Sequence, residues 1–256
     1  MTDDTSAWPE AWSTIYDVMD IDRSPHLGFY KGLVSPQTHS LLDLGCGTGS
    51  ITLPIAEDMP AGSRVVGVDL SPKMIEIARA RAPEHTWVVG DICAPPVTGR
   101  FDLIVICFHT LQLLLEDAQL DQAFGAIAGL LTPGGRFAFD IYQPNLEFLA
   151  TVGPEPYVTR RFADTTGRDI EVVELNGKYD SESRILSGDW VMRDAATGAA
   201  IDVAPIIQRV RQFFPADIDR ALTKAGMHWV ERFGELDRRP LEPASKRQVY
   251  VCMLSK

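Results

Sequence analysis

The sequence contains 256 residues, 45% of them hydrophobic and 23% charged, which is typical of a globular protein with one domain and room for one elaboration. Its 35 acidic and 24 basic residues give a net charge of −11, so the average field repels phosphate backbones and disfavours nucleic-acid partners. The polar start does not look like a signal peptide and no apolar run is long enough to span a membrane, so we expect a cytoplasmic protein without a membrane partner. The four cysteines form no C-x-x-C pair, so we expect no metal site, no disulfide framework and a reducing compartment.

An amphipathic helix is predicted over residues 7–19, and a shorter one over residues 28–33. The first prediction rests on apolar side chains at helical spacing, with Pro9 near the first turn. These side chains are Trp8, Trp12, Ile15, Tyr16 and Met19. Residues 1–7 are expected to be disordered.

The stretch LLDLGCGTG, residues 41–49, predicts a nucleotide-binding turn. Residues 40–44 indicate a buried strand, the glycines at 45, 47 and 49 a tight turn, and residues 50–58 a helix whose amide groups point into the crevice. A dinucleotide oxidoreductase would instead show G-x-G-x-x-G, with the pyrophosphate on the helix. The negative charge of Asp43 would repel a pyrophosphate, but it suits a ligand with cationic groups, such as the sulfonium and ammonium of S-adenosylmethionine.

Two further strands end in carboxylates. Residues 64–69 form an apolar strand that ends at Asp69, 20 residues beyond Gly49, where an acidic side chain can accept both ribose hydroxyls. Ser71 and Pro72 then begin a helix as its N-cap and first residue. A third strand over residues 87–89 is followed by Gly90-Asp91-Ile92.

A continuous apolar run over residues 101–108 predicts a central parallel strand. It ends at His109 and Gln112, in the crevice where open α/β sheets bind ligands. A helix over residues 120–131, a turn through Thr132-Pro133-Gly134-Gly135 and a strand over residues 136–140 follow.

These four signatures, in this order over residues 41–140, resemble those of the class I (Rossmann-like) S-adenosylmethionine-dependent methyltransferases. The resemblance implies an α/β, doubly wound sheet that is mostly parallel with an antiparallel last strand. It implies S-adenosyl-L-methionine as cofactor and S-adenosyl-L-homocysteine as product. The expected cofactor-binding residues are Tyr16, Asp43, Gly45, Cys46, Gly47, Asp69, Leu70, Met74, Asp91, Ile92, Cys107 and Phe108. For Tyr16, Leu70 and Met74, packing in the core is an alternative that stays open.

Residues 143–214 interrupt the alternation of helices and strands. Residues 169–175 alternate apolar and polar side chains, Asn176-Gly177 predicts a hairpin turn, and β-rich runs follow over residues 184–193 and 201–214. We expect an inserted antiparallel sheet over the carboxyl ends of the main strands. A helix over residues 215–225 and strands over 227–233 and 248–254 complete a methyltransferase domain of residues 1–142 and 215–256.

This layout resembles bacterial small-molecule N-methyltransferases, including amino-sugar enzymes, in which a β insertion covers the substrate. The leading hypothesis is methyl transfer to a nitrogen of an amine, amino sugar or heterocycle, by a monomer or homodimer. A small-molecule O-methyltransferase, a tRNA methyltransferase and a non-catalytic S-adenosylmethionine-binding protein remain alternatives. The strand-four turn lacks an N/D-P-P-Y/F tetrapeptide, and Cys107-Phe108-His109 differs from the Ser- or Asn-containing turns of amino-sugar enzymes, so the acceptor stays open.

His109 is the predicted catalytic base, because a protonated nitrogen has no lone pair with which to attack the methyl group. The alternative is a histidine that only packs or caps the next helix. The expected substrate-binding residues are His109, Gln112, Tyr142, Asn145, Arg184 and Arg211, and each of the last four is also open to a structural role.

Overall fold

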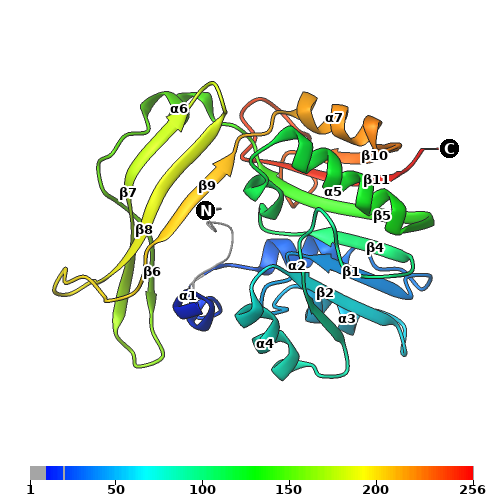
Figure 1. Ribbon diagram of the computed structural model, residues 1–256, viewed down its shortest axis with the longest axis horizontal. Helices are drawn as coiled ribbons and strands as arrows, with labels where there is room; N and C mark the ends of the chain where they lie inside the picture. Colours follow the sequence, from blue (N-terminus) through cyan, green and yellow to red (C-terminus); the bar gives the residue numbers. More distant parts are fainter. Residues whose placement is uncertain (1–9, 20, 256) are drawn as a thin grey trace. The chain divides into compact units, whose positions relative to one another are not determined.

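The computed structural model describes residues 10–19 and 21–255 and divides into two compact units (Figure 1). The large unit comprises Arg23–Pro144 and residues 213–255, and the small unit comprises Asn145–Gln212 with the described residues before Arg23. We expected the N-terminal segment to belong to the methyltransferase domain, whereas its described part clusters with the inserted sheet. The expectations for residues 1–9 lie outside the described residues. The division of the chain into two folding domains stays a prediction.

A seven-stranded sheet forms the centre of the large unit, in the order β10-β11-β5-β4-β1-β2-β3. β11 is antiparallel to both of its neighbours, and the pairs among β1 to β5 are parallel. The predicted fold class, a mostly parallel sheet with an antiparallel last strand, is therefore confirmed. The strands are β1 (Ser40–Leu44), β2 (Arg64–Asp69), β3 (Thr86–Val89), β4 (Phe101–Ile106), β5 (Leu131–Tyr142), β10 (Met227–Phe233) and β11 (Arg247–Leu254).

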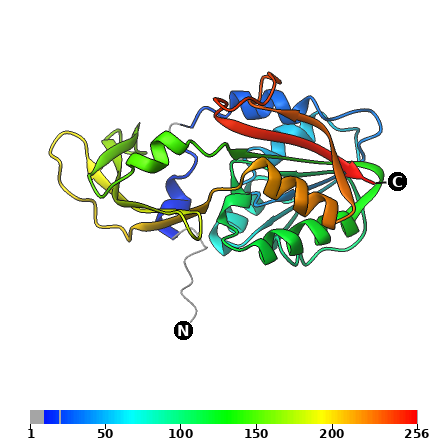
Figure 2. The same cartoon turned by 90° about the horizontal axis from the view of Figure 1, so that it is seen from above.

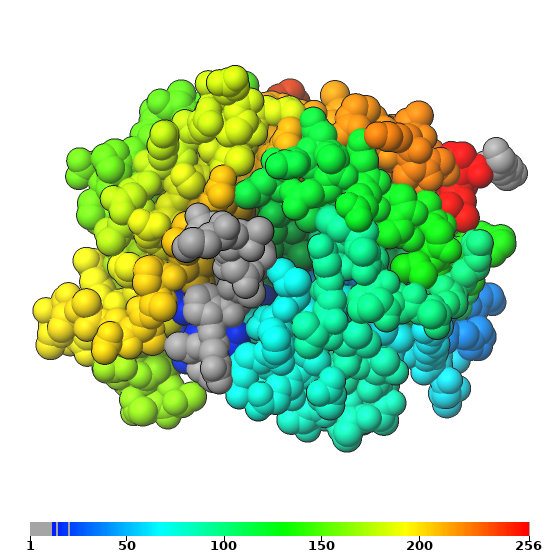
Figure 3. Space-filling view, viewed as in Figure 1, coloured from blue at the N-terminus to red at the C-terminus, as the bar shows by residue number. Residues whose placement is uncertain are grey.

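Helices cover both faces of this sheet (Figure 2). Leu120, Phe124 and Leu222 pack in the core cluster of one face, and Phe29 and Ile55 pack in that of the other. The helices are α2 (Ser24–Lys31), α3 (Thr52–Glu57), α4 (Pro72–Arg81), the 3-10 helix η1 (Thr110–Leu113), α5 (Asp117–Leu130) and α7 (Pro215–Lys224). In Figure 3, the cyan and teal atoms of α4 and of the segment between β3 and β4 form much of the visible surface of this unit.

The strand order reverses between β1 and β4, which are hydrogen-bonded neighbours. The chain continues from β1 to β2 on one side and from β4 to β5 on the other. Open α/β sheets bind ligands beyond the carboxyl ends of the strands at such a point. The fold therefore places the glycine turn after β1 and the loop after β4 side by side at the carboxyl edge of the sheet.

The small unit is built on a four-stranded antiparallel sheet in the order β6-β7-β8-β9. Trp12 and Met19 pack against Phe162 and Val172 in its core, with Tyr16 partly buried beside them. Its elements are α1 (Glu10–Ile15), α6 (Leu146–Thr151), β6 (Tyr157–Ala163), β7 (Asp169–Asp180), β8 (Ile185–Asp194) and β9 (Ile206–Arg211). An inserted antiparallel sheet after β5 was predicted and is confirmed.

The prediction of a hairpin at Asn176-Gly177 was wrong. β7 continues through both residues to Asp180, and the pairing with β8 shifts register between Leu175 and Lys178, which marks a β-bulge. Asn176 has a φ of 57°, and its side-chain nitrogen donates to Asp189 Oδ2 at 2.7 Å. A bulge and a tight turn use the same residue types, because both need a left-handed residue.

Across residues 10–19 and 21–255, no helix has both the length and the apolar composition that a membrane crossing requires.

Candidate functional site

The turn after β1 is held in a conformation that requires glycine. Gly45, Gly47 and Gly49 have φ values of 80°, 54° and 79°. A Cβ on Gly45 would lie 2.5 Å from Thr110 Cγ2, and one on Gly49 would lie 2.9 Å from the Trp87 ring. The glycines are therefore required by the backbone conformation and by close packing, because a side chain at Gly45 or Gly49 would displace a neighbouring element.

Asp69, at the end of β2, fixes this turn and remains available to a ligand. Its Oδ2 accepts from the Gly47 N–H at 2.8 Å and its Oδ1 from the Ser71 N–H at 2.9 Å. Burial raises the pKa of Asp69, although the two amide donors favour the ionised carboxylate. An ionised carboxylate offers about four lone-pair sites, so capacity for two ribose hydroxyls remains.

Asp43 is a buried carboxylate with an unused acceptor. Thr52 Oγ1 donates to Asp43 Oδ2 at 2.5 Å, whereas Oδ1 has no hydrogen-bond partner among the described residues. Burial raises the pKa of Asp43 to about 7, opposed by the Thr52 hydrogen bond and assisted by the charge of Asp69. A buried acceptor without a donor is costly, so this oxygen suits a donor supplied by a bound molecule.

The residues predicted to surround the adenine divide into two groups. Leu70, after β2, is 41% exposed, and Asp91, after β3, is also exposed. The Cys93 N–H donates to Asp91 Oδ1 at 2.8 Å and so orients this carboxylate. Met74 and Ile92 are buried, as are Cys46 and Cys107. An apolar side chain and a carboxylate therefore face solvent beside Asp69. Carboxylate acceptors next to apolar side chains suit a nucleoside ligand with cationic groups.

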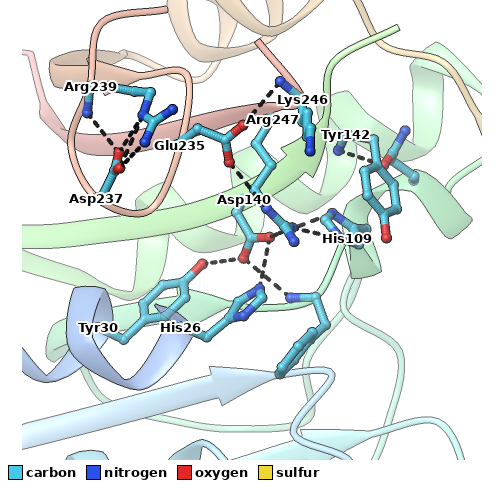
Figure 4. Close-up of polar contacts among 12 residues, drawn as sticks. His26, Tyr30, His109, Asp140, Tyr142, Glu235, Asp237, Arg239, Lys246 and Arg247 are labelled. Carbon is cyan, nitrogen blue, oxygen red and sulfur yellow. Dashed lines mark hydrogen bonds and ion pairs between the residues drawn. The ribbon is translucent and has the colours of Figure 1, made fainter. Parts of the chain in front are cut away.

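A second polar cluster surrounds Asp140 near the end of β5 (Figure 4). Asp140 is fully buried, and its Oδ1 accepts from Tyr30 Oη at 2.7 Å and from the Phe108 N–H at 3.2 Å. Its Oδ2 accepts from His26 Nε2 and from Arg247 Nη1, each at 3.3 Å. Burial opposes ionisation, but the hydrogen bond from His26 and the charges of His109, His26 and Arg247 hold the pKa of Asp140 well below its usual range.

His109 lies on this cluster in a strained backbone conformation. Phe108 and His109 have φ values of 55° and 64°, which are uncommon for residues other than glycine and cluster at functional sites. His109 Nε2 lies 2.9 Å from Arg247 Nη1, and its Nδ1 lies 3.5 Å from Asp140 Oδ2. Its ring stacks on Tyr142 with 3.5 Å between centroids, and its side chain does not cap η1.

Three of the predicted substrate residues come together in the large unit. Gln112 is fully buried and accepts from the Tyr142 N–H at 2.9 Å, and the half-exposed Tyr142 ring covers His109. In the small unit, Asn145 caps α6 by accepting from the Phe148 N–H at 3.0 Å.

The remaining predicted residues also belong to the small unit. Arg184 lies in the turn between β7 and β8 with a φ of 58°, and Arg211 ends β9 and is buried. Tyr16 packs on the core of this unit. The binding roles of all three stay predictions, as does the base role of His109.

The sequence analysis did not identify four residues of the Asp140 cluster as functional, namely His26, Tyr30, Asp140 and Arg247. A carboxylate inside the apolar run FAFDI at the end of a predicted strand was the available signal for Asp140. The other three approach it from α2 and β11, and no local pattern marks them.

Among residues 10–19 and 21–255, no group of three or more His, Cys, Asp or Glu side chains could hold a metal ion. The four cysteines, all within these residues, are buried and unpaired.

Comparisons with known proteins agree with this geometry. A family model described as a methyltransferase domain matches residues 41–135. The cypemycin N-terminal methyltransferase of a Streptomyces species is 31% identical over 189 residues, which cover 72% of this chain and 74% of the relative. Three other curated methyltransferases match with 42%, 55% and 48% of their lengths, so the chain spans about half of these relatives.

Two solved structures share the whole fold. The CcbJ methyltransferase from Streptomyces caelestis superposes with a TM-score of 0.79 at 24% identity, covering 96% of both chains. The amino pentose methyltransferase CalS10 from Micromonospora echinaspora gives a TM-score of 0.73 at 20% identity, covering 97% of this chain and 98% of that one. The chain belongs to the class I S-adenosylmethionine-dependent methyltransferases.

Proposed function

We propose that this protein transfers a methyl group from S-adenosylmethionine to a nitrogen of a small-molecule metabolite. The observation that carries the cofactor half is the pair of carboxylates at the glycine turn, of which Asp43 is buried and Asp69 is partly buried. Asp69 holds the Gly47 amide, and Asp43 presents an acceptor without a donor. Both suit a ligand that brings hydroxyl and ammonium donors together.

Each cofactor-side residue has a separate task in this proposal. Asp69 accepts the ribose hydroxyls, Asp43 faces the ammonium side of the ligand, and Leu70 and Asp91 hold the adenine. Tyr16, with Cys46, Cys107 and Phe108, completes the lining. The bound cofactor supplies a methyl group already activated on a sulfonium, so much of the acceleration can come from holding the acceptor in line with it.

The proposal places the acceptor beside the loop after β4. This loop touches the cofactor turn, because Thr110 fills the space that a side chain on Gly45 would occupy. His109, the residue before Thr110, is the proposed base that takes a proton from the acceptor nitrogen. Gln112, Tyr142, Asn145, Arg184 and Arg211 are proposed to contact the acceptor.

The names of one sequence relative and of two structural neighbours favour nitrogen over oxygen as the atom that accepts the methyl group. The relative with 31% identity carries a name that describes methylation of an N-terminus. Structures of the same fold include a sugar N-methyltransferase and a glycopeptide N-methyltransferase. The proposed acceptor is therefore an amine, an amino sugar or a nitrogen heterocycle.

A metabolite extract tests this choice. The protein is incubated with S-adenosylmethionine and a bacterial small-molecule extract, either untreated or treated with an acetylating reagent that blocks amines, and S-adenosylhomocysteine is measured. We expect product with the untreated extract and a large loss after acetylation. Equal product in both would exclude an amine or amino sugar as the acceptor and leave a heterocycle nitrogen or an oxygen. Cofactor binding without product in either would favour a non-catalytic binding protein.

A further inference from the structure

The contact between His109 and Arg247 determines where the imidazole proton lies. A guanidinium group only donates hydrogen bonds and does not lose its proton in proteins. Because Arg247 Nη1 lies 2.9 Å from His109 Nε2, that nitrogen must accept and carries no proton. A neutral imidazole then holds its single proton on Nδ1, which lies 3.5 Å from the carboxylate oxygen Oδ2 of Asp140.

The surrounding contacts keep the ring in this orientation (Figure 4). The Tyr142 ring stacks on His109, and the Arg247 guanidinium lies 5.5 Å from the centroid of the same Tyr142 ring. Asp140 accepts from the backbone N–H of Phe108, so the carboxylate that faces Nδ1 also holds the strained backbone before it. Arg247 Nη1 and Asp140 Oδ2 form an ion pair at 3.3 Å.

Charges of opposite sign lie on the two sides of the ring. Asp140 is the anion beside Nδ1, and it is already shared among Arg247, His26 and Tyr30. A proton on Nε2 would place a new positive charge 2.9 Å from the Arg247 guanidinium. Glu235 Oε2 lies 3.8 Å from Arg247 Nε, so it is a nearby carboxylate toward which the guanidinium can move.

We infer that Arg247 and Asp140 are positioning residues that hold His109 as a neutral imidazole with its proton on Nδ1 and its basic nitrogen covered by Arg247. His109 Nε2 can then take a proton from the acceptor nitrogen only after Arg247 has moved aside. The imidazolium that results has Asp140 as its counter-ion. Only this proton-transfer step rests on the proposed function, because the position of the resting proton is a property of the protein alone.

Nitrogen-15 NMR of the histidine rings in the full-length protein, without cofactor or acceptor, tests the inference. The chain has five histidines, and the signals lost in a His109→Gln variant assign His109. At slightly alkaline pH, we expect the chemical shifts and ring couplings of an imidazole protonated at Nδ1. A wild-type His109 that is protonated at Nε2, or that exchanges between both forms, would overturn the inference whatever the variants do.

Variants of Arg247 separate positioning from packing. Arg247→Met removes the donor, and we expect the ratio of the two neutral forms to shift toward Nε2–H by at least about tenfold, equivalent to about 1.4 kcal/mol. Arg247→Lys keeps a cationic donor and should retain the wild-type form. Asp237→Asn, which removes a charge from the exposed loop between β10 and β11, is the matched control and should change nothing. An unchanged ratio in Arg247→Met would show that Arg247 does not position the ring.

Discussion

Asp43 and Asp69, near the carboxyl ends of β1 and β2, differ in how their carboxylate oxygens are occupied. Asp69 already accepts two backbone N–H groups, so its orientation is fixed before a ligand arrives. Asp43 accepts from one hydroxyl and keeps an oxygen without a donor, and burial raises the pKa of its carboxyl group to about 7. The first is a preorganised acceptor, and we propose that the second is stabilised by a donor from the ligand.

Replacing Asp69 by alanine should weaken cofactor binding. The loss of hydrogen bonds from hydroxyls to a charged acceptor should cost about 2 to 3 kcal/mol, or roughly 30- to 150-fold in Kd. Isothermal calorimetry with S-adenosylhomocysteine measures this change. Asp58→Ala, which removes only a surface pair with Lys31, is the control and should bind normally. Unchanged affinity in Asp69→Ala would remove the ribose assignment.

Asp43→Asn should change the pH dependence of stability. Because the pKa of Asp43 rises from 3.8 to about 7 on folding, its stabilising contribution is complete below about pH 4 and is lost as pH rises through 7. Asparagine does not titrate, so the variant does not lose this stability as pH rises. The unfolding free energy of the variant, relative to wild type, should therefore increase by on the order of 4 kcal/mol between about pH 4 and pH 8. Urea denaturation without cofactor tests this, and a difference independent of pH would contradict it.

His109→Ala should separate chemistry from cofactor binding. Loss of a general base lowers kcat by roughly 10²- to 10⁴-fold, and the deficit should shrink at high pH, where solvent can deprotonate the acceptor. Affinity for S-adenosylhomocysteine should remain within a few-fold of wild type. His228→Ala, on an exposed position of β10, is the matched control. A variant with a parallel pH-rate profile and a loss of only a few-fold would identify His109 as a packing residue.

At the scale of elements, local patterns predicted the strands and helices that carry one strong signal. The apolar run ending in Asp69 and the Ser71-Pro72 helix start lie where the sequence placed them, and Ser71 Oγ accepts from the Met74 N–H. The prediction at Asn176-Gly177 was wrong because this dipeptide indicates a left-handed residue, which occurs both in a hairpin turn and in a β-bulge. The dipeptide does not indicate where the strand ends. The end of β7 is set by its pairing with β8, and strand pairing is a long-range property that a dipeptide does not reveal.

The bulge predicts a cost for a side chain at Gly177. A Cβ there would lie 2.7 Å from the Gly153 carbonyl oxygen and 3.2 Å from Val152 Cγ2, so Gly177→Ala should destabilise the protein by about 1 to 3 kcal/mol. Gly153→Ala, with no atom within 4 Å of its Cβ, is the control and should stay within about 0.5 kcal/mol of wild type. Urea denaturation distinguishes them, and equal stabilities would show that the bulge relaxes freely.

At the scale of the whole molecule, the two polar centres differ in how far they could be predicted. The glycine turn, Asp43 and Asp69 lie within one βαβ unit, so their spacing in the sequence reports their spacing in the structure. The Asp140 cluster joins α2, the loop after β4, β5 and β11, whose sequence separations exceed 100 residues for the His26 and Arg247 contacts. A single sequence carries no signal for such a meeting of side chains, although each residue type suits it.

The net charge of −11 leads to a prediction about nucleic acids. Binding to tRNA depends on neutralising phosphates with lysine and arginine, and an excess of carboxylates opposes this at every distance within the Debye length. With labelled S-adenosylmethionine, total bacterial tRNA should therefore receive no label above the level seen with heat-inactivated protein. A filter-binding assay should likewise show no retention of tRNA at physiological salt. Salt-sensitive retention together with labelled tRNA would instead reveal a local basic surface strong enough to overcome the average field, and would move the proposed acceptor from a metabolite to an RNA base.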